Sequence, residues 1–374
     1  MAEGGLPERQ TQLVPSDHGA CIFTNDITIE ILSWVPGKSI LRFRRVCKSW
    51  RTLISDPYFV RKQLSHAVRR INNNNNDNLR LLTFTSTSHL KSIDYESLLT
   101  LLAKNKHENA SRVVVPLCRK HKLPLVEPQR RFVQIMGSSN GLICLQINCL
   151  DVVLWNPCTG NANKLPKPTS SAFCENLTSN RQYEIFLFTL KMGSRRTVEG
   201  LNHVELIGRG LLLNRALHWL DRKRGEGSQI DSKLRIISFD LAEENFQEPV
   251  RLPIVIEEQS MIWADVGDYR GSHLLCFLTH FCCRNRSTEI WVMAEYGFEE
   301  SWTKLIVLNV IPYINPHLLY VLEDDNVYVG SSSGNLILYD GKGQRYRSAI
   351  TPKKSLSLQL AMYVETLLSP VTGR

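Results

Sequence analysis

Residues 22–60 read IFTNDITIEILSWVPGKSILRFRRVCKSWRTLISDPYFV, and this stretch predicts three short helices. Asn25 can cap the first helix, which Pro36-Gly37 ends, and Ser39 can cap the second. Asp56-Pro57 has the cap-then-proline pattern with which a third helix begins. Within each helix the apolar residues recur at three- and four-residue spacing, which places them on one face. The stretch therefore predicts a compact helical unit.

This helical unit has more apolar side chains than it can bury by itself, because three short helices make a marginal core. Two interpretations are compatible with the spacing. In the first, the unit is a helical subdomain whose surplus apolar face packs against the rest of the chain. In the second, that face binds another protein. The spacing by itself leaves both open.

Ordered short motifs within the unit carry a resemblance to a known family. They are Ile31-Leu32, Val35-Pro36, Ser39-Ile40-Leu41-Arg42-Phe43, Val46-Cys47-Lys48-Ser49-Trp50 and Ser55-Asp56-Pro57. In this order they resemble the F-box, in particular the plant type. The opening Leu-Pro of the family pattern is replaced here by Phe23-Thr24. In the family those residues help to wrap the adaptor protein, so this departure bears on adaptor binding.

The resemblance implies a partner and a set of contact residues. F-box helices bind a Skp-type adaptor, and through it a cullin and a RING protein, in SCF-type ubiquitin ligases. The chain would then be a non-catalytic subunit that holds a protein substrate close to the enzyme that transfers ubiquitin, which marks the substrate for degradation. The adaptor surface and the small core behind it are expected to consist of Phe23, Ile27, Ile31, Leu32, Val35, Pro36, Leu41, Val46, Cys47 and Trp50. Among these, Trp50 is the strongest candidate for the core.

The rest of the chain predicts a second module built from strands. From residue 79 onward, β-branched and aromatic runs alternate with Gly, Asn, Asp and Pro turns. Hairpins that end in an aromatic residue and a turn recur at roughly 45–50 residues, as propeller blades do. We expect an α+β multidomain chain in which a mostly antiparallel all-β, propeller-like domain follows the helices. The expected divisions are a disordered N-terminus 1–21, a three-helix F-box 22–66, an asparagine-rich linker 67–78, the β domain 79–368 and a tail 369–374.

This β region is similar to the kelch-like, F-box-associated domain of plant F-box proteins. The carriers are Trp155-Asn156-Pro157-Cys158-Thr159-Gly160, Ala216-Leu217-His218-Trp219, Phe239-Asp240-Leu241, Ile290-Trp291-Val292-Met293, Glu295-Tyr296-Gly297 and Glu300-Ser301-Trp302-Thr303-Lys304. The resemblance covers about residues 130–368 and implies an interaction domain for a protein substrate. Between Pro168 and Tyr183 the strand and turn usual in the family are missing. This gap predicts an exposed strand edge or a shifted binding surface in one blade.

Charge is distributed unevenly between the two modules. The chain has 45 Lys and Arg against 36 Asp and Glu, and residues 38–70 contain ten of the former but only Asp56 of the latter. These residues therefore hold the whole net charge of +9, and no wide basic surface is expected elsewhere. Steering of an acidic adaptor is the favoured interpretation. A nucleic-acid binder that uses residues 38–70 is one alternative, and a non-degradative binding protein with a weakened F-box is another.

The catalytic and metal-binding motifs in the sequence are incomplete, which favours a binding protein. Gly137–Gly141 and Gly330–Gly334 match the G-x-S-x-G nucleophile elbow, but a strand follows each where a helix is required, so hairpin turns are predicted. Ligand-like spacings such as that of Cys118 and His121 lack a second pair, so neither a metal nor a cofactor is expected. No apolar run is long enough to cross a membrane. We expect a soluble protein of the cytoplasm, the nucleus or both.

Overall fold

The computed structural model describes the helical module, the strands of the β domain and the C-terminal segment. The described residues are 25–72, 78–85, 89–104, 118–122, 124, 133–147, 151–167, 185–190, 192–198, 204, 206–224, 230–255, 261–269, 274–281, 287–309, 316–321, 327–331, 336–339, 342, 346–349 and 358–373. Phe23-Thr24, residues 1–21 and the segment 168–184 lie outside this set. The expectations stated for them stay predictions.

Helices form the N-terminal module: α1 (Asn25–Ser33), α2 (Gly37–Phe43), α3 (Lys48–Ser55) and α4 (Pro57–Asn72). The three expected helices are therefore four, because a turn at residues 44–46 divides the second, and α2 begins before Ser39 rather than after it. Cys47 has an extended backbone at this turn, with φ −154° and ψ 167°, and its Sγ accepts a hydrogen bond from the Trp50 amide. The Cys47 side chain thus caps α3 and separates it from α2.

The fourth helix begins where the sequence predicted the third. The Asp56 carboxylate accepts a hydrogen bond from the Tyr58 amide at 2.7 Å, as expected of a residue at a helix start. At its other end, α4 continues to Asn72, so residues 67–72 are helical and do not belong to the expected linker. Burial of Ala67 and two arginines in the last turn, where the helix dipole favours positive charge, account for the extra length.

The strands of the described chain form five sheets. In the first, β23 (Leu358–Val364) precedes β1 (Leu79–Thr85), β2 (His89–Asp94) and β3 (Cys118–His121), and helix α5 (Tyr95–Lys104) follows β2. The second contains β4 (Val133–Ser139), β5 (Leu142–Ile147), β6 (Asp151–Trp155) and β7 (Ala162–Lys164). A two-stranded sheet follows, with β8 (Ile185–Thr189) and β9 (Ser194–Val198).

The remaining strands belong to two larger sheets. The first is β10 (Leu206–Leu213), β11 (Ala216–Arg224), β12 (Ile230–Asp240), β13 (Asn245–Phe246) and β14 (Val250–Val255). The second has two meanders: β15 (Met261–Tyr269), β16 (Leu274–Phe281), β17 (Ser287–Met293) and β18 (Trp302–Asn309), then β19 (Pro316–Val321), β20 (Val327–Ser331), β21 (Leu336–Tyr339) and β22 (Tyr346–Ala349). The meanders meet through one parallel pairing, Tyr269 with Val321. A short 3-10 helix, η2 (Glu299–Ser301), precedes β18.

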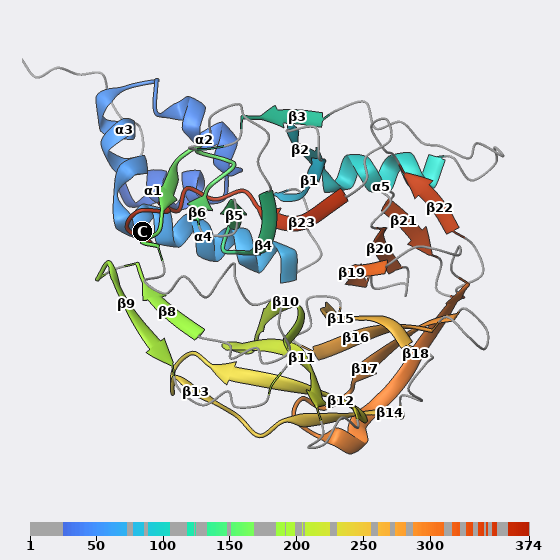
Figure 1. Cartoon of the computed structure of the whole chain (residues 1–374). Helices are drawn as coiled ribbons and strands as arrows, with labels where there is room; N and C mark the ends of the chain where they lie inside the picture. Colours follow the sequence, from blue (N-terminus) through green and yellow to red (C-terminus); the bar gives the residue numbers. More distant parts are fainter. Residues whose placement is uncertain are drawn as a thin grey trace, which may run out of the picture.

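The sheets follow one another around a circle, which gives the β domain its propeller-like form (Figure 1). The circle closes where β23 pairs antiparallel with β1, from Leu79 opposite Val364 to Thr85 opposite Leu358. The prediction of recurring antiparallel hairpins is confirmed. The first elbow-like motif lies in such a hairpin, since β4 pairs with β5, and the second begins in one, since Gly330 of β20 lies opposite Leu336 of β21. No described helix is long and apolar enough to span a membrane.

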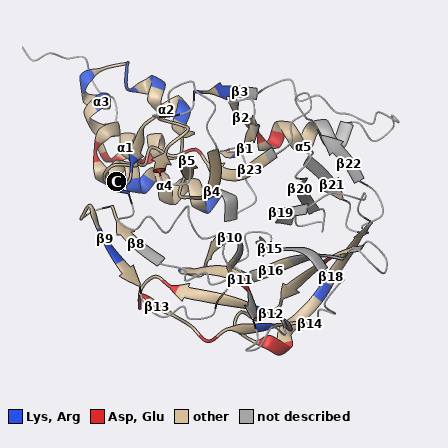
Figure 2. Cartoon of the chain, viewed as in Figure 1, with Lys and Arg blue, Asp and Glu red and all other residues tan. Residues whose placement is uncertain are grey.

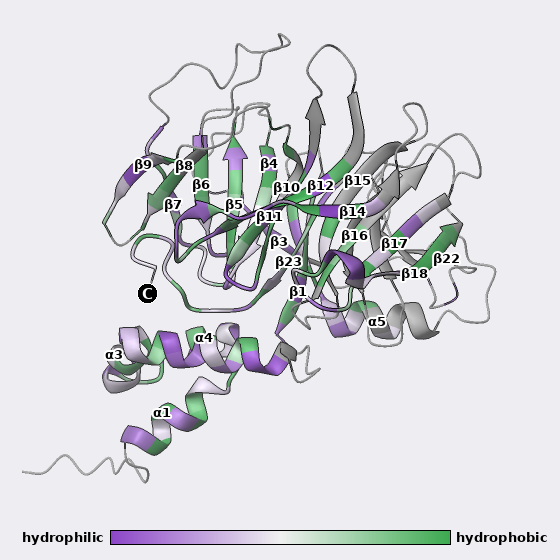
Figure 3. Cartoon of the chain, turned by 90° about the horizontal axis from the view of Figure 1, so that it is seen from below, coloured by the Kyte–Doolittle hydropathy of each residue, from purple (hydrophilic) through white to green (hydrophobic). Residues whose placement is uncertain are grey.

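The helical module lies on one side of the β domain, below it in Figure 3. One apolar cluster combines helix residues with the first residue of β5 and with the chain after β23. Its buried members are Leu32, Ile40, Ile54, Phe59, Val60, Leu142, Leu367 and Leu368. The module therefore packs its inner face on its own chain, as the first interpretation of the sequence proposed.

Candidate adaptor-binding surface

The outer side of α1 exposes large apolar side chains. Ile27 is 46% exposed and Ile31, one turn later, is 52% exposed, whereas the neighbouring Leu32 is buried in the cluster against the C-terminal segment. Residues four apart on a helix share a face, so the two isoleucines form one apolar strip. Helix α1 therefore separates the candidate residues into an outer pair and a core residue.

A second exposed apolar position lies at the turn between α2 and α3. Val46 is 63% exposed, and Cys47 beside it is also exposed. Behind them, Leu41 and Trp50 are half-buried and pack against the inner cluster. The Trp50 ring meets that of Phe43 edge to face, with centroids 5.7 Å apart. Trp50 thus packs against Phe43 and the inner cluster and is only partly buried.

The other candidates are divided in the same way. Val35 is half-buried against the inner cluster, and Pro36 is half-buried at the N-cap of α2. Phe23 lies outside the described residues. The structure therefore places Ile27, Ile31, Val46 and Cys47 outside, Leu32 inside, and Val35, Pro36, Leu41 and Trp50 between them.

Hydrogen bonds to its sulfur distinguish Cys47 from the buried cysteines. The Ser49 hydroxyl and the Trp50 amide lie 3.2 Å and 3.4 Å from Sγ, and these contacts lower the pKa of the Cys47 thiol. Burial does the opposite elsewhere and raises the pKa of Cys158 to about 12. Cys47 is therefore an exposed residue that caps a helix and not a core residue.

Side-chain contacts that the sequence pattern does not predict hold α1 against α4. Glu30 pairs with Lys62 at 2.5 Å and accepts a hydrogen bond from Trp34 Nε1 at 2.9 Å. The hydrogen bond from Lys62 is the main cause that lowers the pKa of Glu30. The Trp34 ring also meets His66 edge to face at 4.0 Å and lies under the Arg70 guanidinium at 5.6 Å. These contacts fix the angle at which α1 presents its isoleucines.

The inner side of the module rests on the segment that follows β23. Gln63 Nε2 donates to the Glu365 carbonyl at 3.4 Å. A Cβ at position 37 would lie 3.2 Å from the same carbonyl oxygen and 3.1 Å from Cys158 Sγ, so glycine there allows the close approach of α2. Gly37 thus has a second role besides ending the preceding helix, because the absence of a side chain there allows α2 to pack closely against the β domain.

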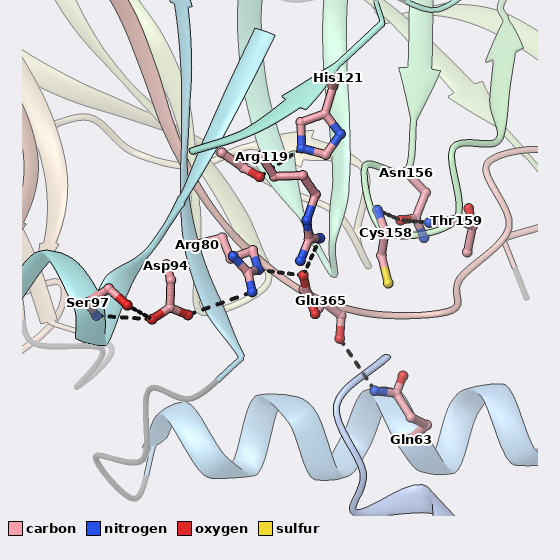
Figure 4. A network of polar contacts seen from close by, with 11 residues as sticks. Gln63, Arg80, Asp94, Ser97, Arg119, His121, Asn156, Cys158, Thr159 and Glu365 are labelled. Atoms are coloured by element: carbon pink, nitrogen blue, oxygen red, sulfur yellow. Dashed lines mark hydrogen bonds and ion pairs between the residues drawn. The ribbon is translucent and has the colours of Figure 1, made fainter. Parts of the chain in front are cut away.

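Buried polar contacts hold that segment in place (Figure 4). Glu365 is almost fully buried and pairs with Arg80 and, at 2.8 Å, with Arg119. Asn156 Nδ2 donates to the carbonyls of Thr366 and Leu368 at 3.0 Å and 2.8 Å. Strands from three parts of the sequence thus fix the surface on which the helices lie.

The module is also positively charged on its outer side. Of the ten basic residues between 38 and 70, seven are exposed: Arg42, Arg44, Arg45, Lys48, Arg51, Arg61 and Arg69. Figure 2 shows them as blue segments along α2, α3 and α4. The exposed Val46 therefore lies among basic residues, which suits an acidic protein partner, whereas α1 with Ile27 and Ile31 carries Asp26 and Glu30 and no Lys or Arg. Among the described residues there is no group of three His, Cys, Asp or Glu side chains that could hold a metal.

Comparison with known families supplies the identity of both modules. Residues 22–62 match the F-box domain, and residues 163–365, more than half of the chain, match the F-box associated beta propeller domain. The chain belongs to the F-box proteins with this propeller domain. Members of these families are typically non-catalytic adaptors, and an F-box domain implies binding of a Skp-type adaptor.

Relatives of this F-box protein are found in Arabidopsis thaliana. F-box/kelch-repeat protein At3g23880 is 26% identical and aligns over 91% of this chain and 94% of its own length. F-box protein CPR1 is 25% identical over 84% of this chain and 81% of its own. Among solved structures, "YCF48 bound to D1 peptide" aligns with 77% of this chain and 90% of that chain at TM-score 0.38 and 8% identity, too low a likeness to carry a functional argument.

Proposed function

We propose that this F-box protein is a substrate-recognition subunit of an SCF-type ubiquitin ligase. Its helices bind a Skp-type adaptor, which connects to a cullin and a RING protein, while the β domain binds a protein substrate. The chain contributes no bond-making residue and acts by holding the substrate close to the transferring enzyme. We expect it to work in the cytoplasm or the nucleus.

One observation carries the proposal. The helical module packs its inner face on the β domain, and yet Ile27, Ile31 and Val46 remain about half exposed or more. An apolar face left exposed after a module has docked on its own chain is typical of a protein-binding site. The exposed basic residues beside Val46 add attraction for an acidic adaptor.

The test is a quantitative binding assay between the full chain and a Skp-type adaptor. Ile31→Asp removes an apolar contact and places a carboxylate in the interface, which costs about 2 kcal/mol and weakens binding roughly thirtyfold. Val307→Asp is the matched control, because Val307 is 42% exposed and lies on β18 of the β domain. Equal adaptor binding by both variants would overturn the assignment of α1 to the interface.

A non-degradative adaptor is the competing proposal. It predicts that the wild-type chain, expressed in plant cells, binds a partner through the β domain but never co-purifies a cullin. Recovery of the cullin with wild type, and its loss with Ile31→Asp, supports the ligase proposal instead. Phe23→Leu with Thr24→Pro restores the usual family pattern and measures how far that departure weakens adaptor binding.

A further inference from the structure

Two turns of neighbouring meanders lie close together on the β domain. One follows β12 at residues 241–244, and the other follows β17 at residues 294–301. Tyr296 from the second turn contacts His218 of β11, whose ring Nε2 lies 2.7 Å from the Tyr296 hydroxyl. Further along, Trp302 Nε1 donates to the Arg251 carbonyl at 3.1 Å. The second turn is therefore attached to the preceding meander at both ends.

Exposed apolar side chains cluster on these turns. Phe298 is 57% exposed, and Leu241 and Tyr296 are each 38% exposed. The Tyr296 ring is fixed, because His218 is buried and its ring lies edge to face with that of Tyr296 at 5.7 Å. Burial lowers the pKa of His218, so the neutral ring donates from Nδ1 to the Leu211 carbonyl and accepts from Tyr296. An aromatic ring that is already fixed loses little conformational entropy when a partner binds.

The same turns are strongly acidic. Residues 240–248 contain Asp240, Glu243, Glu244 and Glu248, residues 294–300 contain Glu295, Glu299 and Glu300, and neither stretch contains Lys or Arg. Outside residues 38–70 the chain is otherwise balanced in charge. Arg196 pairs with Glu244 and Arg215 acts electrostatically on Asp240, and the remaining five carboxylates add to the negative field. Figure 2 shows the acidic segments at η2 and beside β13.

These turns also act on one another electrostatically. The pKa of Tyr296 is raised first by burial and then by the negative charge of Asp240, so the first acidic turn lies within electrostatic reach of the second. Asp240 itself stays ionised, because hydrogen bonds from the Glu243 and Ala242 amides lower its pKa. The Tyr296 ring therefore lies within the negative field of the first turn.

We propose that this acidic–aromatic strip, residues 240–248 and 294–300, binds a basic segment of the protein substrate, one in which Lys or Arg flanks an apolar anchor. The anchor packs on Phe298, and the cationic side chains pair with the glutamates and lie over the aromatic rings. The inference deepens the proposed function, since it assigns a partner chemistry to the substrate-binding domain. Complementary charge is what selects the partner here.

The test uses the full chain and a phage-displayed library of short random peptides. Wild type should enrich peptides with net positive charge and an aromatic or aliphatic residue. The best peptide, made synthetically, is then titrated by fluorescence anisotropy. Glu299→Lys with Glu300→Lys should weaken its binding about tenfold, because attraction turns into repulsion at exposed sites, and Phe298→Ser should weaken it about tenfold by removing the anchor contact. Binding by wild type should also weaken as salt rises.

Matched variants separate the strip from general effects. Asp26→Lys reverses charge on α1, and Val307→Ser removes an exposed apolar side chain from β18, away from the turns; both should bind the peptide as wild type does. Enrichment of neutral or acidic peptides, or equal loss in the control variants, overturns the proposal. Adaptor binding is measured in parallel. If wild type binds the adaptor but enriches no basic peptide, the strip alone is refuted; if wild type binds the basic peptide but not the adaptor, the ligase proposal alone is refuted.

Discussion

Replacing Asn156 should destabilise the junction between the two modules more than any other single polar change of its size. This side chain is fully buried and makes four hydrogen bonds. It donates to the Thr366 and Leu368 carbonyls, and its Oδ1 accepts from the Cys158 and Thr159 amides at 2.8 Å and 3.2 Å. Each net bond contributes about 1 kcal/mol, and unpaired buried groups cost more, so Asn156→Ala should cost about 3–4 kcal/mol.

Asn163→Ala is the control, because Asn163 is half-buried and makes a single comparable bond, to the Pro370 carbonyl at 3.1 Å. We expect it to cost about 1 kcal/mol. Urea unfolding followed by tryptophan fluorescence measures both free energies. Hydrogen exchange locates the effect, since Asn156→Ala should increase exchange at residues 365–368 and in α2. A difference between the variants below about 1 kcal/mol, or unchanged exchange at those residues, would refute the reasoning.

Three further outcomes are expected. Gly141→Ala should lower the melting temperature well below that of Gly160→Ala, because both have positive φ but only at position 141 would the Cβ lie 2.6 Å from a backbone carbonyl oxygen; calorimetry measures both. Burial and neighbouring arginines lower the pKa of His121 to about 4, so the unfolded chain binds the proton first and stability should fall as pH drops from 6.5 towards 4. In urea titrations across that range, His121→Gln should flatten the slope. Iodoacetamide should alkylate Cys47 faster than Cys158, whose thiol is buried, and peptide mass spectrometry compares the two rates.

The helical segments were predictable because local signals determine them. A proline after Asp56 begins α4, and apolar spacing predicts which segments are helical. The same spacing placed Cys47 within the second of the three expected helices, whereas in the structure Cys47 has an extended backbone and caps α3. Spacing compares the positions of side chains on an assumed continuous helix, so it gives no sign of a sulfur that accepts a backbone hydrogen bond.

Which apolar residues face outward could not be read from the sequence. Ile31 and Leu32 are adjacent and chemically alike, yet one is half exposed and the other buried. The difference comes from packing on α4, because Phe59 and Val60 of that helix, about 27 residues further along the chain, share the buried cluster with Leu32, and α4 covers only one side of α1. Local periodicity does not encode contacts over such a separation.

The strand hairpins of the β domain were predictable for the same local reason, and the closure of the circle was not. Turn residues and alternating apolar positions identify neighbouring strands such as β11 and β12. The pairing of β1 with β23 joins residues 79–85 to 358–364 and has no local signal. Family resemblance marked His218 and Tyr296 as characteristic residues, but only the structure shows that they touch.

Closure of the β domain and placement of the F-box depend on the same few residues. The chain leaves β23, the strand that closes the circle, and within the next four residues supplies the carbonyl that Gln63 contacts and two leucines of the cluster that the helices share. If β23 leaves β1, those leucines lose their position and the helices lose the surface on which they pack. An incompletely closed β domain would then hold its F-box in no fixed orientation. A receptor that works by positioning its substrate would thus lose that ability together with its fold.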